Sequence, residues 1–294
     1  MTLGVDRFQN DKLIKKTILG NLPPRTRDSH KGDFGSVGIL GGAPGMIGAV
    51  LLAARAALHL GAGKVYAASL CSSITLDFMQ PEIMLLSPAQ LLGAPLTVLV
   101  VGPGLGRSEQ AGQLLQIALQ SPVILVLDAD ALNLLAESKN LKELTQNRTR
   151  PTLLTPHPGE AARLLGCDTR TIQRGRPAAA LQLVEKYRAW VVLKGADSIC
   201  AAPDKEWSVN ATGNPGLSSA GMGDVLTGML AAVLAQGVAP LAALQLAVYL
   251  HGAAADSLLQ QGMGPVGLTA SEVTLEARTL LNKRTASNVA VDYL

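Results

Sequence analysis

The sequence predicts a three-layer α/β fold, with a mostly parallel central sheet flanked by helices. Short runs such as Val98–Val101 are continuously apolar, so both of their faces must be covered, as in a parallel sheet between helices. These runs alternate with longer Ala- and Leu-rich stretches of helical length, the order that right-handed β-α-β crossovers produce. Hydrophobic residues make up 48% and charged residues 16% of the 294-residue chain. That balance excludes a disordered chain and disfavours a coiled coil.

Each expected element follows from this alternation. The expected strands are 36–40, 64–68, 97–101, 123–127, 152–155, 190–193, 199–201 and 207–209. The expected helices are 47–60, 108–119, 131–136, 159–165, 177–188, 222–235, 241–260 and 271–281. The last two strands lie close together and are expected to form a hairpin around Pro203, Asp204 and Lys205.

The chain shows no internal linker, so we expect one domain over 31–283, preceded by a polar, helical or loose leader at 1–30 and followed by a frayed tail at 284–294. Residues 225–250 carry no charge, but Gly237 and Pro240 divide them into two buried helices, so no membrane partner is expected. A net charge of +3 is too small to indicate a nucleic-acid partner. Three scattered cysteines without a C-x-x-C pair indicate a reducing compartment, and we expect a cytoplasmic protein.

Two glycine-rich junctions follow expected strands. Residues 41–49 resemble a dinucleotide fingerprint only in part, and a tight turn explains them as well as ligand binding does. Residues 102–106 hold three glycines directly after a buried strand, which favours a wall against which a flat or charged ligand lies. Ligands of such folds bind outside the carboxyl ends of the strands, where both junctions lie.

Polar residues also follow the strands. Asp128 and Asp130 could hold magnesium through water or cap a helix; we expect Asp130 to be a cap and keep Asp128 as a site candidate. His157 is held extended between two prolines, which makes it a site candidate, although a structural histidine is the alternative. Lys194 directly follows a buried strand, so it must face solvent or an anion, and phosphate contact is plausible. The other histidines, His30, His59 and His251, lack such framing and are expected to be structural or exposed.

The stretch 210–224 gives the strongest signal. Its glycines allow the loop amides to turn inward, and the helix that follows adds its positive end, so the segment suits phosphate oxygens. It is not a Walker A loop, because Met222 stands where that motif requires Lys. Asp224 in the first helical turn is either a dipole partner or the acceptor of the proton of an attacking hydroxyl.

Taken together, these motifs resemble the ADP/ATP-dependent NAD(P)H-hydrate dehydratase family, a branch of the ribokinase-like superfamily. The resemblance covers about residues 31–283 and rests on segments 41–49, 102–106, 128–133, 155–160, 194–195 and 221–224 in that order. Some members carry an N-terminal epimerase domain, and the leader here is too short for one, so the chain resembles the stand-alone dehydratase.

The resemblance implies a ribokinase-like fold and a carbon–oxygen lyase that uses ADP or ATP, with Mg²⁺, to convert (6S)-NADHX or NADPHX back to NADH or NADPH. Products would be phosphate and AMP or ADP. It also implies a homotetramer and a functional link to an NAD(P)H-hydrate epimerase. The alternatives are a ribokinase-like kinase for a vitamin-precursor alcohol and a non-catalytic dinucleotide sensor. An acid beside a phosphate disfavours the sensor.

The resemblance also implies roles for individual residues. Asp224 would be the catalytic base. The adenine nucleotide and its phosphates would contact Lys194, Gly195, Ala196, Asp197, Ser198, Gly221, Met222 and Gly223. The hydrate would contact Ala49, Gly104, Gly106, His157, Asn214 and Asp224. Glu160 would hold magnesium through water, in a His157–Glu160 segment that stands where related kinases carry N-x-x-E.

Overall fold

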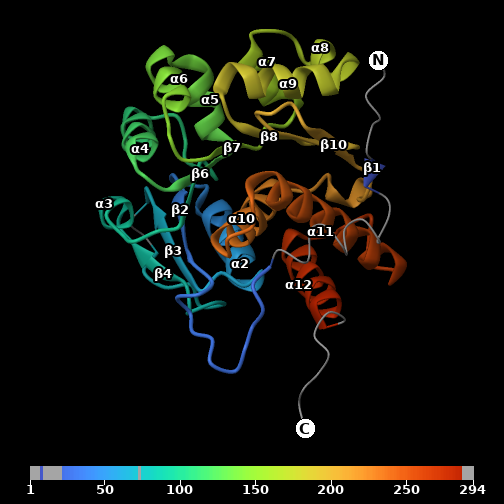
Figure 1. Ribbon diagram of the computed structural model, residues 1–294. Coiled ribbons are helices and arrows are strands. Elements are labelled where there is room, and N and C mark those ends of the chain that lie inside the picture. The colour runs from blue at the N-terminus through green and yellow to red at the C-terminus, as the bar shows by residue number, and fades with distance from the viewer. Residues whose placement is uncertain (1–6, 9–21, 72–73, 287–294) are drawn as a thin grey trace.

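The computed structural model describes residues 7–8, 22–71 and 74–286, which form a three-layer α/β structure around one sheet (Figure 1). Its strands lie in the order β1-β10-β9-β8-β7-β6-β5-β2-β3-β4. Neighbours from β8 to β4 are parallel, whereas β8, β9 and β10 pair antiparallel. The strands are β1 (Arg7–Phe8), β2 (Ser36–Gly41), β3 (Lys64–Ser69), β4 (Met84–Leu86), β5 (Val98–Val101), β6 (Ile124–Leu127), β7 (Thr152–Leu154), β8 (Trp190–Leu193), β9 (Ser198–Ala201) and β10 (Trp207–Asn210).

Helices cover both faces of the sheet (Figure 1). One layer holds α3 (Pro88–Leu92), α4 (Glu109–Gln120), α5 (Asp130–Glu137), α6 (Lys139–Gln146), α7 (Pro158–Leu165), α8 (Thr169–Arg174) and α9 (Arg176–Tyr187). The other holds α2 (Ile47–His59), α10 (Met222–Ala235), α11 (Pro240–Gln260) and α12 (Ala270–Ala286). Alternate strand residues enter two separate cores: in β5, Val98 and Val100 pack toward α2 and α10, and Leu99 and Val101 toward α4 and α5. This double burial explains why the central strands β5, β6 and β8 are apolar throughout.

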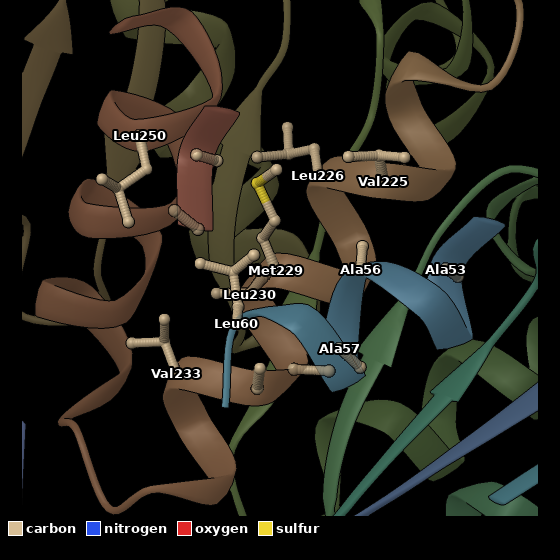
Figure 2. Packing of buried hydrophobic residues seen from close by; sticks show 14 of the residues in the cluster. Ala53, Ala56, Ala57, Leu60, Val225, Leu226, Met229, Leu230, Val233 and Leu250 are labelled. Carbon is tan, nitrogen blue, oxygen red and sulfur yellow. The ribbon is translucent and has the colours of Figure 1, made fainter. Parts of the chain in front are cut away.

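The tightest helix contact joins α2 and α10. Gly228 on α10 lies against Ala53 on α2, where a Cβ atom would be 2.1 Å from the Ala53 carbonyl oxygen. Alanines, including Ala56 and Ala57, line the rest of this contact, so the helices approach closely, with Met229 and Leu230 packed at its edge (Figure 2). Small residues at a helix contact are therefore a packing requirement here.

Gly228→Ala is expected to lower the free energy of unfolding by about 2–3 kcal/mol, because the added methyl would overlap backbone that cannot move independently. Gly112→Ala is the matched control: this glycine lies inside α4 with no atom within 4 Å of an added Cβ. There the better helix propensity of alanine should stabilise by about 0.5–1 kcal/mol. Chemical denaturation of both variants measures the difference, and equal stabilities would contradict this account of the α2–α10 contact.

The predicted fold class is confirmed, and each expected strand is present with ends that shift by at most one residue. The β9–β10 hairpin also forms, closed by the Lys205 amide bond to the Ala202 carbonyl oxygen at 3.0 Å. The uncharged stretch divides as expected, since α10 ends at Ala235 and α11 begins at Pro240. None of the described helices is long and apolar enough to cross a bilayer.

Several elements were not predicted. β4 and α3 are too short to show a hydrophobic period, and the mostly polar sequence of α6 resembles a loop. Within the segment expected to be helical or loose, Arg7–Phe8 is instead a strand paired with β10. The rest of that segment up to residue 21 lies outside the described residues, as does the tail from residue 287, and α12 extends to Ala286.

Candidate active site

The candidate site is built on loops that leave the carboxyl ends of β2, β5, β6, β7 and β8, the edge where α/β folds bind ligands. The loops after β2 and β5 pair through backbone, with the Gly42 amide donating to the Pro103 carbonyl oxygen at 3.0 Å. The loop after β5 also presses on the one after β6: a Cβ on Gly102, which has φ +133, would lie 1.8 Å from the Asp128 carbonyl oxygen. Glycine is required at this point both by conformation and by space.

Two expected substrate residues meet in this region. A Cβ on Gly104 would lie 3.3 Å from the Cβ of Ala49, at the start of α2. Gly106 follows in the same loop, and its amide donates to Asp130 Oδ2 at 2.8 Å. The prediction that Asp130 caps a helix is therefore wrong. Asp130 is the first residue of α5, Ala129 occupies the cap position without a side-chain bond, and the carboxylate holds the glycine loop instead.

A buried ion pair lies beneath the site. Lys194 Nζ donates to Asp128 Oδ1 at 2.7 Å, and Thr227 Oγ1 donates to Asp128 Oδ2 at 2.9 Å. The Asp128 side chain is 2% exposed and that of Lys194 is 17% exposed. Burial alone would lower the pKa of Lys194, but the neighbouring carboxylates Asp128, Glu160 and Asp224 outweigh it and raise the pKa. Lys194 is thus a fixed cation, and its ammonium lies 3.3 Å from where a Gly223 Cβ would stand.

Asp224 lies in the first turn of α10, next to this cation. Gly221 is the helix N-cap, with φ +85, and no side chain caps the helix. The N-terminal amides of α10 can therefore serve an anion. Burial, and then repulsion by Asp128, raises the pKa of Asp224 from 3.8 to about 6, although Lys194 works in the opposite direction. A carboxylate with that pKa is ionised at neutral pH and is a better proton acceptor than an ordinary aspartate.

His157 is the N-cap of α7. Its Nδ1 accepts from the amides of Gly159 and Glu160 at 3.0 and 3.3 Å, so the proton of the neutral ring lies on Nε2. Glu160 completes a capping box by accepting from the His157 amide at 2.7 Å. The expected extended backbone is confirmed. The histidine has structural contacts at both ring nitrogens, because Nε2 also lies 3.4 Å from Glu160 Oε1, while its side chain is 51% exposed.

Glu160 itself is 5% exposed. Burial raises its pKa, and the charge of Lys194 partly offsets this. In the part of the chain that the structure describes, no group of three or more His, Cys, Asp or Glu side chains is arranged to hold a metal ion. A dedicated protein cage for a cation is therefore absent from these residues.

The loop from Lys194 to Ser198, expected to contact the nucleotide, is held from below by Arg176 at the start of α9. One guanidinium nitrogen donates to the carbonyl oxygens of Leu193, Lys194 and Asp197 at 3.0, 3.3 and 3.4 Å. Ser198 Oγ donates to the Gly195 carbonyl oxygen at 2.8 Å, so this hydroxyl shapes the loop.

Asn214, an expected substrate residue, is tied into its own loop. Its Oδ1 accepts from the Gly216 amide at 3.0 Å, and its Nδ2 donates to Asp256 Oδ1 at 3.0 Å. The Asn214 side chain therefore stabilises the loop through both its oxygen and its nitrogen.

Sequence reasoning placed Lys194, Gly223 and Asp224 correctly near one another but missed three partners. Thr227 and Asp256 are polar residues in or beside a long uncharged stretch, a signal that was available. Arg176 begins a helix next to Pro177 and gave no signal, because its partners are backbone carbonyls distant in sequence.

The fold and the site define a ribokinase-like α/β protein with an uncapped helix terminus beside a partly buried carboxylate. The family model that describes NAD(P)H-hydrate dehydratase matches residues 37–276. The chain is 44% identical over 275 residues to the ADP-dependent (S)-NAD(P)H-hydrate dehydratase of Neisseria meningitidis, covering 90% of each protein. It is 40% identical over 283 residues to a bifunctional NAD(P)H-hydrate repair enzyme of Coxiella burnetii, covering 94% of this chain but 56% of that relative.

A solved structure agrees. The ADP/ATP-dependent NAD(P)H-hydrate dehydratase of Bacillus subtilis, crystallised with ATP and Mg²⁺, superposes with a TM-score of 0.83 at 30% identity, covering 96% of this chain and 99% of that one. The chain belongs to the NAD(P)H-hydrate dehydratase family. It spans about half the length of the bifunctional relatives.

Proposed function

We propose that this protein restores NADH or NADPH from its 6S hydrate, using ADP or ATP to convert the C6 hydroxyl into a leaving group. The observation that carries the proposal is Asp224. A carboxylate with a pKa of about 6 lies at the uncapped N-terminus of α10, beside the fixed cation Lys194. An acid in an anion site repels its ligand unless it has a task, and accepting a hydroxyl proton is such a task.

The proposed chemistry runs in two steps. Asp224 accepts the proton of the C6 hydroxyl while that oxygen attacks the terminal phosphorus of the nucleotide, whose bond to the bridging oxygen breaks. The amides at Gly221, Met222 and Gly223 hold the phosphoryl oxygens. The lone pair of the ring nitrogen then expels phosphate and leaves an iminium ion at C6. Loss of a proton from C5 to solvent restores the C5–C6 double bond of the reduced nicotinamide, and Asp224 returns its own proton to solvent. Positioning and charge stabilisation by the protein suffice for both steps.

The proposal also assigns the other expected nucleotide and hydrate contacts to residues around Asp224. Residues 194–198, shaped by Arg176 and Ser198, would bind the adenine nucleotide. Ala49 and Gly104, which lie together, would form the wall for the hydrate with Gly106, and the half-exposed ring of His157 would close it.

Magnesium fits this site as an ion carried mainly by nucleotide phosphates and waters. Mg²⁺ keeps several waters and takes one or two carboxylates in nucleotide sites. Buried Glu160, whose Oε1 lies 3.4 Å from His157 Nε2 and takes no part in the capping bond, would hold it through water. The ion would supply charge neutralisation on the phosphates.

The direct test mixes the purified protein with magnesium, ADP or ATP and NADH hydrate. Recovery of the near-ultraviolet absorbance of NADH, together with inorganic phosphate, is expected. No recovery with either nucleotide would refute the proposal, whereas a phosphorylated product without phosphate release would identify a small-molecule kinase instead.

The pH profile is expected to follow Asp224. Because its ionised form is the base, kcat should fall about tenfold per pH unit below about 6 and level off above it. Asp128→Asn removes a charge that raises this pKa and frees Lys194 to lower it, so the acidic limb should move to lower pH. Stopped assays across pH 5–8 measure this; an acidic limb that does not move would assign it to another group.

We further propose that the protein is a cytoplasmic homotetramer that works with an NAD(P)H-hydrate epimerase. The bifunctional names of the longer relatives support the link to an epimerase. The family resemblance supports the homotetramer.

A further inference from the structure

The loop that connects β10 to α10 is largely exposed, yet it leads directly into the phosphate-binding helix terminus. Gly213, Pro215 and residues 218–220 are exposed to solvent. Gly213 has φ +111, and Gly221 at the other end has φ +85. Because this loop is exposed, its conformation depends on contacts with neighbouring elements.

The first part of this loop is fixed to one face of α11. Thr212 Oγ1 donates to the Tyr249 carbonyl oxygen at 3.2 Å, and a Cβ on Gly252 would lie 2.2 Å from that hydroxyl oxygen. One turn further, Asp256 Oδ2 accepts from the Gly213 amide at 2.8 Å. Positions 249, 252 and 256 share one face of α11. Thr212 contacts the first two of these positions and Gly213 contacts the third, so the loop runs along this face.

Asp256 fixes both the backbone and a side chain of the loop. While Oδ2 holds the Gly213 amide, Oδ1 accepts from Asn214 Nδ2 at 3.0 Å, and Asn214 in turn holds the Gly216 amide at 3.0 Å. The carboxylate thereby orders the path from Gly213 through Gly216. In this geometry each carboxylate oxygen of Asp256 takes one of the two donors.

α11 also contacts the far end of the loop. His251, 8% exposed, lies beside the backbone of Met222. Burial lowers the pKa of His251 to about 4, although the Met222 backbone works in the opposite direction, so the imidazole is neutral. The same helix thus holds the loop at residues 212–214 and packs against the start of α10.

We propose that Asp256 is a positioning residue for phosphoryl transfer, which fixes the loop 212–221 so that the amides at Gly221–Gly223 and the Asp224 carboxylate meet the reacting phosphate. This inference rests on the proposed function. Asp256 acts through Gly213 and Asn214, and the adenine-binding residues 194–198 belong to a different loop. Its loss should therefore affect turnover more than nucleotide affinity.

The test compares Asp256→Asn with Asp168→Asn. In Asp256→Asn, either the Gly213 amide or Asn214 Nδ2 faces an NH₂ group instead of an acceptor. We expect kcat to fall at least about tenfold. The Kd for ADP, measured by isothermal titration calorimetry, should change less than about threefold. Asp168 caps α8 by accepting from the Thr171 amide at 2.6 Å, a task that asparagine performs equally well, so kcat should be retained.

A double variant separates positioning from general destabilisation. With Asn214→Asp added to Asp256→Asn, the amide at 256 can donate to the new carboxylate and still accept from Gly213, so kcat should recover at least about fivefold. Asn214→Ala tests the same clamp from the loop side, should Asp256→Asn fail to fold, and should lower kcat several-fold.

Undiminished kcat in Asp256→Asn or Asn214→Ala, or no recovery in the double variant, overturns the inference. An inactive wild-type protein would instead refute the proposed function. Amide exchange across 212–217, expected to be faster in Asp256→Asn than in wild type, then still reports whether Asp256 orders the loop, and unchanged exchange overturns that role.

Discussion

Asp224→Asn is expected to lower kcat by about 10³–10⁴-fold while leaving nucleotide binding intact. The amide has the same shape but cannot accept the hydroxyl proton, whereas the α10 amides proposed to bind phosphate are unchanged. Recovery of NADH from its hydrate measures turnover, and titration calorimetry with ADP measures binding.

The same variant should be more stable than the wild type at neutral pH. The folded pKa of Asp224 is raised from 3.8 to about 6, so its ionised form costs stability once pH exceeds 3.8, and the full cost is present above about 6. Asparagine removes that cost. Asp204→Asn in the β9–β10 turn, where the side chain accepts from the Glu206 amide, is the control and should change neither property. Retained turnover in Asp224→Asn would place the base elsewhere.

Lys194→Met is expected to have the largest effect on stability, about 3–5 kcal/mol, because it leaves Asp128 buried with an unpaired charge. The variant should also bind nucleotide more weakly, since the cation beside Gly223 is lost. Urea denaturation measures the first effect and calorimetry with ADP the second.

Two comparisons sharpen this prediction. Adding Asp128→Asn should restore much of the stability without restoring nucleotide affinity, because the unpaired charge is gone but the cation is not replaced. Lys139→Met removes one partner of an exposed pair with Glu143 at 3.7 Å, and should cost less than about 1 kcal/mol. Similar losses in both lysine variants would contradict the assignment of Lys194 to a buried pair.

Much of the fold was predictable because burial on both faces leaves a direct trace in the sequence. Val98–Val101 is continuously apolar for that reason, and the glycines around 102–106 mark a place where backbone meets backbone. Short elements such as β4 left no such trace, because a few residues show no period and depend on tertiary pairing with β3.

The site was predictable where chemistry and position coincide in sequence. Asp224 and the glycines before it are adjacent, so a candidate anion site could be predicted there. The contacts of Asp130 and Arg176 could not, because each binds backbone of a loop distant in sequence. A carboxylate at the first turn of a helix has the same local sequence whether it caps that helix or holds a neighbouring loop.

The backbone contact between Gly228 and Ala53 has a mechanical consequence. α10 carries Asp224, the proposed proton acceptor, and α2 carries Ala49, the proposed wall for the hydrate; with no side chain between the helices at Gly228, neither can slide or tilt without moving the other. On the proposed function, the distance between base and hydroxyl would therefore be set by the scaffold before either ligand arrives. On the proposed function, adjustment to nucleotide entry and product departure falls to the surface loop at 194–198, so rates of release would be open to tuning there without disturbing the geometry of proton transfer.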